Sequence, residues 1–240
     1  MSRLRVAPIV EGEGEVECIR ILLERIWSDM IGGEYVDVLR PTRTSRTKLA
    51  RRLDSGELRI DLEEVAEVVG KASKKLLEKR SDDFVIPELV LILIDADEDC
   101  PKTKALGLGP ELLDVAKKAV EKRSDRTGVA CVIANVEYET WFVAAAESLR
   151  DKGYLSLPDE FQPILEPESQ RAGKNWIIKR FNRKETQDLR NPQSYKETRD
   201  QPAMTDAMNL SLCRARSPSF DKLCRELGKF VAKTSEQKKN

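Results

Sequence analysis

Apolar residues recur along this chain with two different spacings. Short continuous apolar runs are typical of strands buried on both faces, whereas apolar residues three or four positions apart are typical of amphipathic helices. The clearest strand is the run Glu-Leu-Val-Leu-Ile-Leu-Ile at 88–94. The pattern predicts strands at 5–10, 35–39, 88–94 and 128–134, and helices at 16–30, 58–79, 110–123, 136–149 and 218–232, the last capped by Ser217.

The order of these elements predicts the class of fold. Strands and helices alternate over about 150 residues, which is typical of an α/β domain with a mostly parallel sheet flanked by helices. Beyond Gly153 the strand pattern stops and prolines become frequent. We therefore expect an α/β domain over residues 1–152, and a basic, mainly helical and irregular C-terminal extension over residues 153–240 packed on it.

Composition removes several classes of chemistry. The chain has 240 residues, 40% of them hydrophobic, and no histidine, which excludes Ser-His-Asp triads, HExxH metallopeptidases and His-ligated zinc. Five scattered cysteines without a CxxC pair favour neither a zinc site nor a disulfide framework. Because the sequence has neither a signal-peptide pattern nor a run of ~18 apolar residues, we expect a cytoplasmic protein without a membrane span.

Charge is balanced overall but not along the chain. The 42 basic and 42 acidic side chains give a formal net charge of zero. Residues 1–168 carry 25 Lys and Arg against 34 Asp and Glu, whereas residues 169–240 carry 17 against 8. An acidic N-terminal part and a basic C-terminal part favour a metal-holding pocket beside a phosphate-binding surface. An unevenly charged, solvated surface explains the counts equally well.

Two groups of acidic residues follow predicted strands. Glu11, Glu13, Glu15 and Glu17 come after the first strand, and Asp95, Asp97, Glu98 and Asp99 come after the strand at 88–94. Ligands of parallel sheets bind at the carboxyl ends of strands, where these groups would meet and repel each other unless protonated or bridged by a cation. Oxygen ligands at this density suit Mg²⁺ or Mn²⁺. We expect Glu13 and Glu17 to be solvated acids that favour the helix dipole.

The same residues resemble a known domain. Val10-Glu11-Gly12, with Glu15 four residues after Glu11, and Asp95-Ala96-Asp97 after an apolar strand resemble the two motifs of TOPRIM domains, which occur in topoisomerases, bacterial primases and OLD-type nucleases. The segments 137–142 (EYETWF), 195–197 (YKE) and 217–220 (SPSF) resemble, more specifically, a bacterial TOPRIM-like family of unassigned function that accompanies phage-defence ATPases. The glycine that often follows the TOPRIM DxD motif is missing here.

The resemblance implies a metal-dependent nuclease, acting as the effector of an anti-phage defence system with a separate ATPase. Two ions, Mg²⁺ or Mn²⁺, would activate a water and stabilise the leaving oxygen during phosphodiester cleavage. Glu11 would do acid–base work, and Lys196 would neutralise charge on the scissile phosphate. The implied catalytic residues are Glu11, Asp95, Asp97 and Lys196, and the implied metal ligands are Glu11, Glu15, Asp95, Asp97, Asp99 and Glu139.

Two basic clusters bear on the substrate. Guanidinium forks among short hydroxyls suit the phosphate backbone of nucleic acid, and aromatic neighbours suit stacking on single strands; a solvated charged loop is the alternative for each. The first cluster comprises Arg40, Arg43, Arg46, Lys48, Arg51 and Arg52, with Thr42, Thr44, Ser45 and Thr47 interspersed. The second comprises Lys174, Lys179, Arg180, Arg183 and Lys184, beside Trp176 and Phe181.

Other functions fit less of the sequence. A haloacid-dehalogenase-type phosphatase needs Thr or Val at the fifth position of its DxDx[TV] motif, where this chain has Asp99. A non-catalytic TOPRIM-fold subunit that binds an ATPase or nucleic acid remains the alternative. No GxxxxGK[ST] occurs, so an ATPase would have to be a separate subunit. The sequence leaves open a homo-oligomer and the choice between DNA and RNA.

Overall fold

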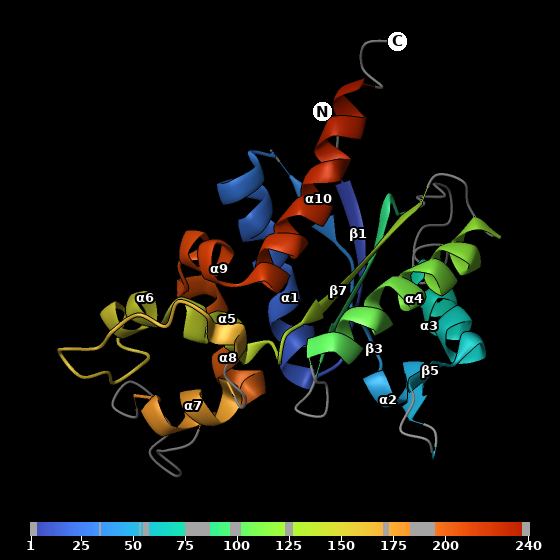
Figure 1. Ribbon diagram of the computed structural model, residues 1–240. Coiled ribbons are helices and arrows are strands. Elements are labelled where there is room, and N and C mark those ends of the chain that lie inside the picture. The colour runs from blue at the N-terminus through green and yellow to red at the C-terminus, as the bar shows by residue number, and fades with distance from the viewer. Residues whose placement is uncertain are drawn as a thin grey trace.

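A parallel β-sheet lies at the centre of the molecule, and helices cover both of its faces (Figure 1). The computed structural model describes residues 4–33, 35–52, 54, 58–74, 87–96, 102–122, 127–169, 173–182 and 195–236. Every strand pair within this sheet is parallel, which confirms the predicted α/β class. A separate two-stranded ribbon is antiparallel.

The strand order is β2-β1-β6-β7, with β3 also pairing with β1. The register sets Val6 of β1 opposite Leu89 of β6, and Leu89 opposite Gly128 of β7. The carboxyl ends of β1, β6 and β7 therefore lie next to one another. The strands are β1 (Leu4–Val10), β2 (Val36–Val38), β3 (Thr42–Arg43), β4 (Ala50–Arg52), β5 (Leu58–Ile60), β6 (Leu89–Asp95) and β7 (Gly128–Ala134).

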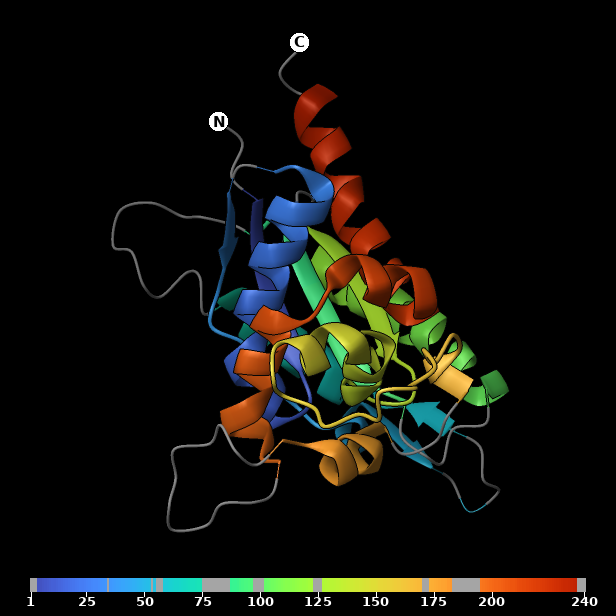
Figure 2. The same ribbon diagram turned by 90° about the vertical axis from the view of Figure 1, so that its left-hand side faces the viewer.

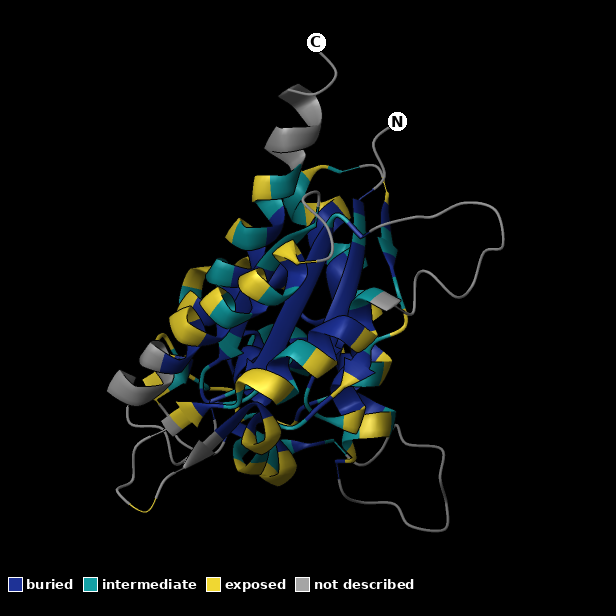
Figure 3. Ribbon diagram, turned by 90° about the vertical axis from the view of Figure 1, so that its right-hand side faces the viewer, coloured by how far each residue is buried: buried dark blue, intermediate teal, exposed yellow. Residues whose placement is uncertain are grey.

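Alternate residues of the strands face two different hydrophobic clusters. Leu91 and Leu93 of β6 pack in one cluster, and Val90 and Ile92 pack in the other. Because side chains of a strand alternate between faces, a run that is apolar at every position needs cover on both sides. That explains why most residues of β1 and β6 are buried (Figure 3).

Helices from the first half of the chain cover both faces. Helices α3 (Leu62–Lys74) and α4 (Lys102–Glu121) lie on one face, while α1 (Glu13–Arg25) lies on the other (Figures 1 and 2). The remaining helices are a π-helical turn η1 (Ile26–Ile31), α2 (Arg46–Leu49), α5 (Glu139–Ala144), α6 (Ala146–Asp151), the 3-10 turn η2 (Pro167–Ser169), α7 (Gly173–Arg180), α8 (Glu197–Ala207), α9 (Leu210–Arg216) and α10 (Pro218–Glu236).

The C-terminal helices complete the α1 face of the sheet. Met204 of α8 and Phe220 of α10 are fully buried in the same cluster as Leu22 of α1 and Leu91 of β6. Arg25 of α1 connects this helix to the C-terminal region, because its Nη1 donates hydrogen bonds to the carbonyl oxygens of Thr205 (2.7 Å) and Met208 (2.9 Å). The predicted helical C-terminal region is thus confirmed, and it shares one core with the sheet.

The predicted starts of α3 and α4 were wrong. The helix expected over 58–79 begins at Leu62, because Leu58–Ile60 pairs as β5 with β4 and Asp61 Oδ1 caps the helix by accepting from the Glu64 N–H (3.1 Å). The helix expected from Pro110 begins at Lys102, so Pro110 lies inside it; Gly107 and Gly109 weaken the helical pattern before this proline.

The helix expected over 136–149 is divided into α5 and α6 at Ala145. At the division, Arg216 Nη1 donates to the carbonyl oxygen of Ala144 (2.9 Å) and to Glu147 Oε2 (2.8 Å). An arginine from α9 therefore binds a carbonyl at the end of α5. This contact joins residues 72 positions apart, which periodicity cannot indicate.

The Ser217 cap of α10 is confirmed and gives a first prediction. Its buried Oγ accepts from the Phe220 N–H (3.3 Å) and donates to Glu168 Oε1 (2.6 Å). Because loss of an N-cap leaves helix N–H groups unsatisfied, Ser217→Ala is expected to lower the free energy of unfolding by about 1–2 kcal/mol in urea denaturation. Ser211→Ala, on the exposed side of α9, is the control. Equal unfolding free energies for the two variants would contradict the capping role.

Candidate functional site

Acidic side chains meet at the carboxyl edge of the sheet. Glu11 follows β1 directly, Asp95 is the last residue of β6, and Glu139 begins α5 after β7. The strand order places these three strand ends in sequence across the edge. Glu15 joins them from the first turn of α1. The four acids thus come from four different elements.

Glu11 is held by two backbone groups. Its Oε1 accepts from the Arg46 N–H at the start of α2 (2.8 Å), and its Oε2 accepts from the Asp95 N–H (3.3 Å). Arg46 is itself buried and donates from Nη1 to the carbonyl oxygen of Ala96 (3.0 Å). The Glu11 carboxylate is therefore fixed directly beside the end of β6, and its orientation is set by N–H donors.

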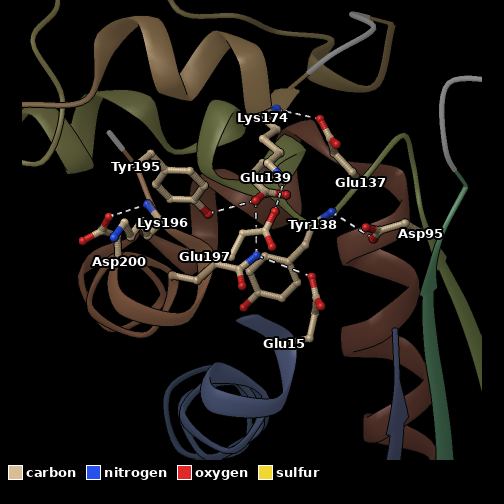
Figure 4. Close-up of polar contacts among 11 residues, drawn as sticks. Glu15, Asp95, Glu137, Tyr138, Glu139, Lys174, Tyr195, Lys196, Glu197 and Asp200 are labelled. Atoms are coloured by element: carbon tan, nitrogen blue, oxygen red, sulfur yellow. Dashed lines mark hydrogen bonds and ion pairs between the residues drawn. The ribbon is translucent and has the colours of Figure 1, made fainter. Parts of the chain in front are cut away.

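Asp95 ends β6, the strand that lies between β1 and β7. Its Oδ1 accepts from the Tyr138 N–H (3.1 Å), as Figure 4 shows. Burial raises the pKa of the Asp95 carboxyl well above its ordinary value, and the charges of Glu15, Glu139 and Glu11 raise it further. Ionisation of Asp95 is thus less favourable than in a free aspartate, and a positive charge at the site would favour it.

Glu139 and Glu15 are the most deeply buried members. Glu139 is 3% exposed, its Oε1 accepts from the Tyr195 hydroxyl (2.9 Å), and burial together with the charge of Glu137 raises its pKa to about 8. Glu15 is 7% exposed, and burial raises its pKa as well. Among the residues that the structure describes, Glu15 Oε2 has no hydrogen-bond partner.

Two glycines make room for this arrangement. A Cβ atom on Gly12 would lie 2.1 Å from Glu15 Oε2, and one on Gly14 would lie 1.7 Å from Oε1 of Gln201 in α8. Neither distance leaves space for a methyl group. The Glu-Gly-Glu-Gly-Glu segment therefore uses its glycines to admit a carboxylate and an amide close to the backbone.

Tyr195 and Glu197 are the residues of segment 195–197 whose side chains make contacts around the acidic edge. Tyr195 donates to Glu139, and Glu197 forms an ion pair with Lys174, whose backbone N–H donates to Glu137 Oε1 (2.6 Å; Figure 4). Lys196, at the N-cap of α8, is exposed, and its backbone N–H donates to Asp200 Oδ2 (2.7 Å). The proposed contact of Lys196 with a phosphate stays a prediction.

The donor chemistry of this edge fits a hard divalent cation. It offers carboxylate oxygens whose charges oppose one another, and a buried oxygen of Glu15 without a partner in the described part of the chain. Within the described ranges, however, no three Asp, Glu or Cys side chains are close enough to hold one ion together. Asp97 and Asp99, two of the predicted ligands, lie outside the described residues.

The first basic cluster is partly structural. Arg40, Arg43 and Lys48 are exposed, although Arg43 also forms an ion pair with Glu13 (2.7 Å). Arg46 is buried, and its guanidinium donates to the carbonyl oxygen of Ala96. Thr42 and Thr44, expected among the phosphate-binding hydroxyls, are each only 6% exposed, so that expectation was wrong for these two threonines. The side chains of Arg51 and Arg52 lie outside the described set.

The second basic cluster also combines exposed side chains with packed ones. Lys179 is exposed on α7, and the Arg180 guanidinium lies over the Trp176 ring, 4.2 Å from its centroid. Phe181 is only 8% exposed and packs edge-on against Tyr195, so the expectation that it stacks on bases was wrong. Arg183 and Lys184 lie outside the described residues.

One hollow of the described surface lies away from the acidic edge. A cavity of about 640 Å³ opens beside β5, α3 and α4, and Leu62 at its rim is 61% exposed. None of the predicted catalytic or metal-binding residues lines it. Its lining residues are Arg59, Ile60, Asp61, Leu62, Glu63, Glu111, Asp114 and Val115.

Sequence reasoning missed the contributors that come from α8. Gln201 contacts both Glu15 and Glu139 across 186 and 62 positions of sequence. One signal could have indicated it: Gln201 stands four residues after Glu197, and therefore on the same face of a helix that begins with the 195–197 motif.

The fold and the acidic edge of the sheet together define an α/β protein with an acidic cluster at the carboxyl end of a parallel sheet. The chain belongs to the family described as a domain of unknown function, DUF4276, whose model matches residues 10–228. That span includes Glu11, Glu15, Asp95 and Glu139, all of α8 and α9, and the first part of α10. No curated protein and no solved structure matches the chain. In the described part of the chain, no helix is long and apolar enough to cross a membrane.

Proposed function

We propose that this protein is a divalent-metal-dependent nuclease of the TOPRIM type, which hydrolyses phosphodiester bonds of nucleic acid. The observation that supports this most is the mutual repulsion of Asp95, Glu15 and Glu139 at one edge of the sheet. Burial raises the pKa of all three, the charges of Glu15 and Glu139 also raise the pKa of Asp95, and the charge of Glu15 also raises the pKa of Glu139. A cation relieves such repulsion, so clusters of this kind are typical of metal sites.

Each residue has a distinct role in this proposal. Mg²⁺ or Mn²⁺ would be held by Asp97 and Asp99 together with carboxylates drawn from Glu15, Asp95 and Glu139. No three of the described acids lie close enough to hold one ion by themselves. Such an ion, when bound, lowers the pKa of a water and stabilises negative charge on the phosphate. The Tyr138 N–H orients Asp95, and the two backbone donors orient Glu11 beside it for proton transfer. Lys196 would face the scissile phosphate as a point charge.

The basic residues would position the substrate. Arg46 begins α2 with its N–H on the Glu11 carboxylate, so Arg40, Arg43 and Lys48 belong to the segment that borders the acidic edge. Phosphate contacts of this kind fix the register of a strand without reading its bases. Lys179 and Arg180 of α7 would extend the contact, because α7 packs beside α5.

A separate ATPase would control the activity. The chain contains no GxxxxGK[ST] phosphate-binding loop, so it supplies no ATPase of this kind itself. The resemblance to a family that accompanies phage-defence ATPases supports a cytoplasmic effector of an anti-phage system. A surface that docks such a partner would leave the acidic edge open to nucleic acid.

The direct test is cleavage of nucleic acid by the purified protein. We expect degradation or nicking of DNA or RNA with Mg²⁺ or Mn²⁺, none in EDTA, and none with Glu11→Ala, which removes the group held beside Asp95. Glu17→Gln, exposed on α1 outside the cluster, should cleave like the parent protein. Background cleavage by parent and Glu11→Ala alike, with and without a partner ATPase, would exclude a nuclease and favour a non-catalytic subunit.

A further inference from the structure

The acidic edge is closed by a neutral amide from the C-terminal region. Gln201 of α8 is fully buried, and its Nε2 lies 3.4 Å from Glu15 Oε1 and 3.4 Å from Glu139 Oε1. One amide group therefore faces two carboxylates, one on α1 and the other on α5.

The chemical type of this residue is informative. A lysine at this position would neutralise one carboxylate and remove the reason for a cation to bind, whereas a glutamate would add to the repulsion. An amide donates hydrogen to both acids and leaves their charge unchanged. The hydroxyl of Tyr195, just before α8, acts on Glu139 in the same neutral way.

The packing of α8 on α1 is arranged around this contact. Gln201 Oε1 lies so close to Gly14 that a Cβ atom there would be 1.7 Å away, and the same Cβ would lie 2.8 Å from the Cβ of Glu197. Among the described residues Oε1 has no hydrogen-bond partner. A fully buried polar atom without a partner is unfavourable for folding, and such exceptions are expected where function requires them.

We propose that Gln201 is a positioning residue of the acidic edge: it holds the Glu15 and Glu139 carboxylates in place for a cation without neutralising them. The C-terminal region thereby supplies part of the site and does not merely cover the sheet. This inference rests on the proposed function, because it assigns Gln201 to the cation site of that reaction.

The test measures Mn²⁺ binding by calorimetry and cleavage as a function of Mn²⁺ and nucleic acid. Gln201→Met, which keeps the length of the side chain and removes its donor, is expected to weaken Mn²⁺ binding roughly 10-fold or more. At limiting Mn²⁺, kcat should fall, while KM for nucleic acid should change less than about 2-fold, since Gln201 is buried away from the substrate surface. A merely structural role would lower Tm and leave the Mn²⁺ affinity unchanged.

Gly14→Ala provides a second variant, because the added methyl must displace the Gln201 amide. Gly228→Ala is its matched control: it also lies in a helix, and a Cβ there meets no atom within 4 Å. We expect Gly14→Ala to weaken Mn²⁺ binding as Gln201→Met does, and Gly228→Ala to bind like the parent protein.

The outcomes separate the two proposals. A parent protein that binds Mn²⁺ and cleaves, with Gln201→Met and Gly14→Ala binding equally well, would overturn the role of Gln201 alone. Mn²⁺ binding that depends on Gln201, without any cleavage, would overturn the nuclease and keep the role of Gln201 at a cation site. A parent protein that neither binds Mn²⁺ nor cleaves would overturn both.

Discussion

Asp95→Asn is expected to abolish cleavage and, at the same time, to stabilise the metal-free protein. Cleavage should fall roughly 10³-fold or more, because the variant loses the central carboxylate of the proposed metal site. Stability should rise by roughly 1 kcal/mol or more at pH 8 in EDTA, since burial and the charges of Glu15, Glu139 and Glu11 all oppose ionisation of Asp95. Asparagine can still accept the Tyr138 N–H through its side-chain oxygen.

The opposite signs make this variant informative. Most inactive variants lose activity because they unfold. Replacement of a functional acid that lowers the stability of the fold should instead remove activity and raise stability. Cleavage rates and urea unfolding curves in EDTA measure the two effects on the same preparation. Asp206→Asn, an exposed position on α8, is the control and should change neither quantity. An Asp95→Asn protein that is both active and no more stable than the parent would contradict the proposed role of the cluster.

The sequence predicted the sheet well because its signals are local. The run at 88–94 is apolar at every position, which requires cover on both faces and therefore a central parallel strand. The same reasoning placed Glu11 and Asp95 at strand ends, and in the structure these ends are adjacent, with Glu11 Oε2 accepting from the Asp95 N–H. Short-range patterns thus positioned two of the acids without any knowledge of the helices.

What the sequence could not predict are the contacts made across long separations. The roles of Gln201 and Tyr195 depend on how α8 packs against α1. The four-residue spacing of Glu197 and Gln201 indicates a shared helix face, but it does not indicate what that face packs against. The burial of Arg46 has the same origin, because a basic run with short hydroxyls looks alike whether its guanidinium faces phosphate or the carbonyl oxygen of Ala96. Tertiary contacts decided these positions, and local composition did not.

Glu139 gives the second large prediction, a pH dependence of stability. Its pKa in the folded protein is about 8, against an ordinary value of 4.5, so between these values the folded state holds a proton that the unfolded state has lost. The free energy of unfolding in EDTA should therefore fall as pH rises from about 5 to 8, by up to about 1.4 kcal/mol per pH unit for each such proton. The raised pKa values of Glu15 and Asp95 add to this dependence with the same sign.

Glu139→Gln removes the ionisable group and keeps an oxygen that accepts from Tyr195, so it should flatten this pH dependence and raise stability at pH 8. Urea denaturation of parent and variant in EDTA at several pH values measures the change, and Glu17→Gln should keep the parental slope. Saturating Mn²⁺ should also reduce the slope in the parent protein, because a bound cation favours the ionised carboxylates. A parent protein whose metal-free stability rises steadily from pH 5 to 8 would show that these buried acids are already compensated within the fold, and would leave no electrostatic reason for a cation at this edge.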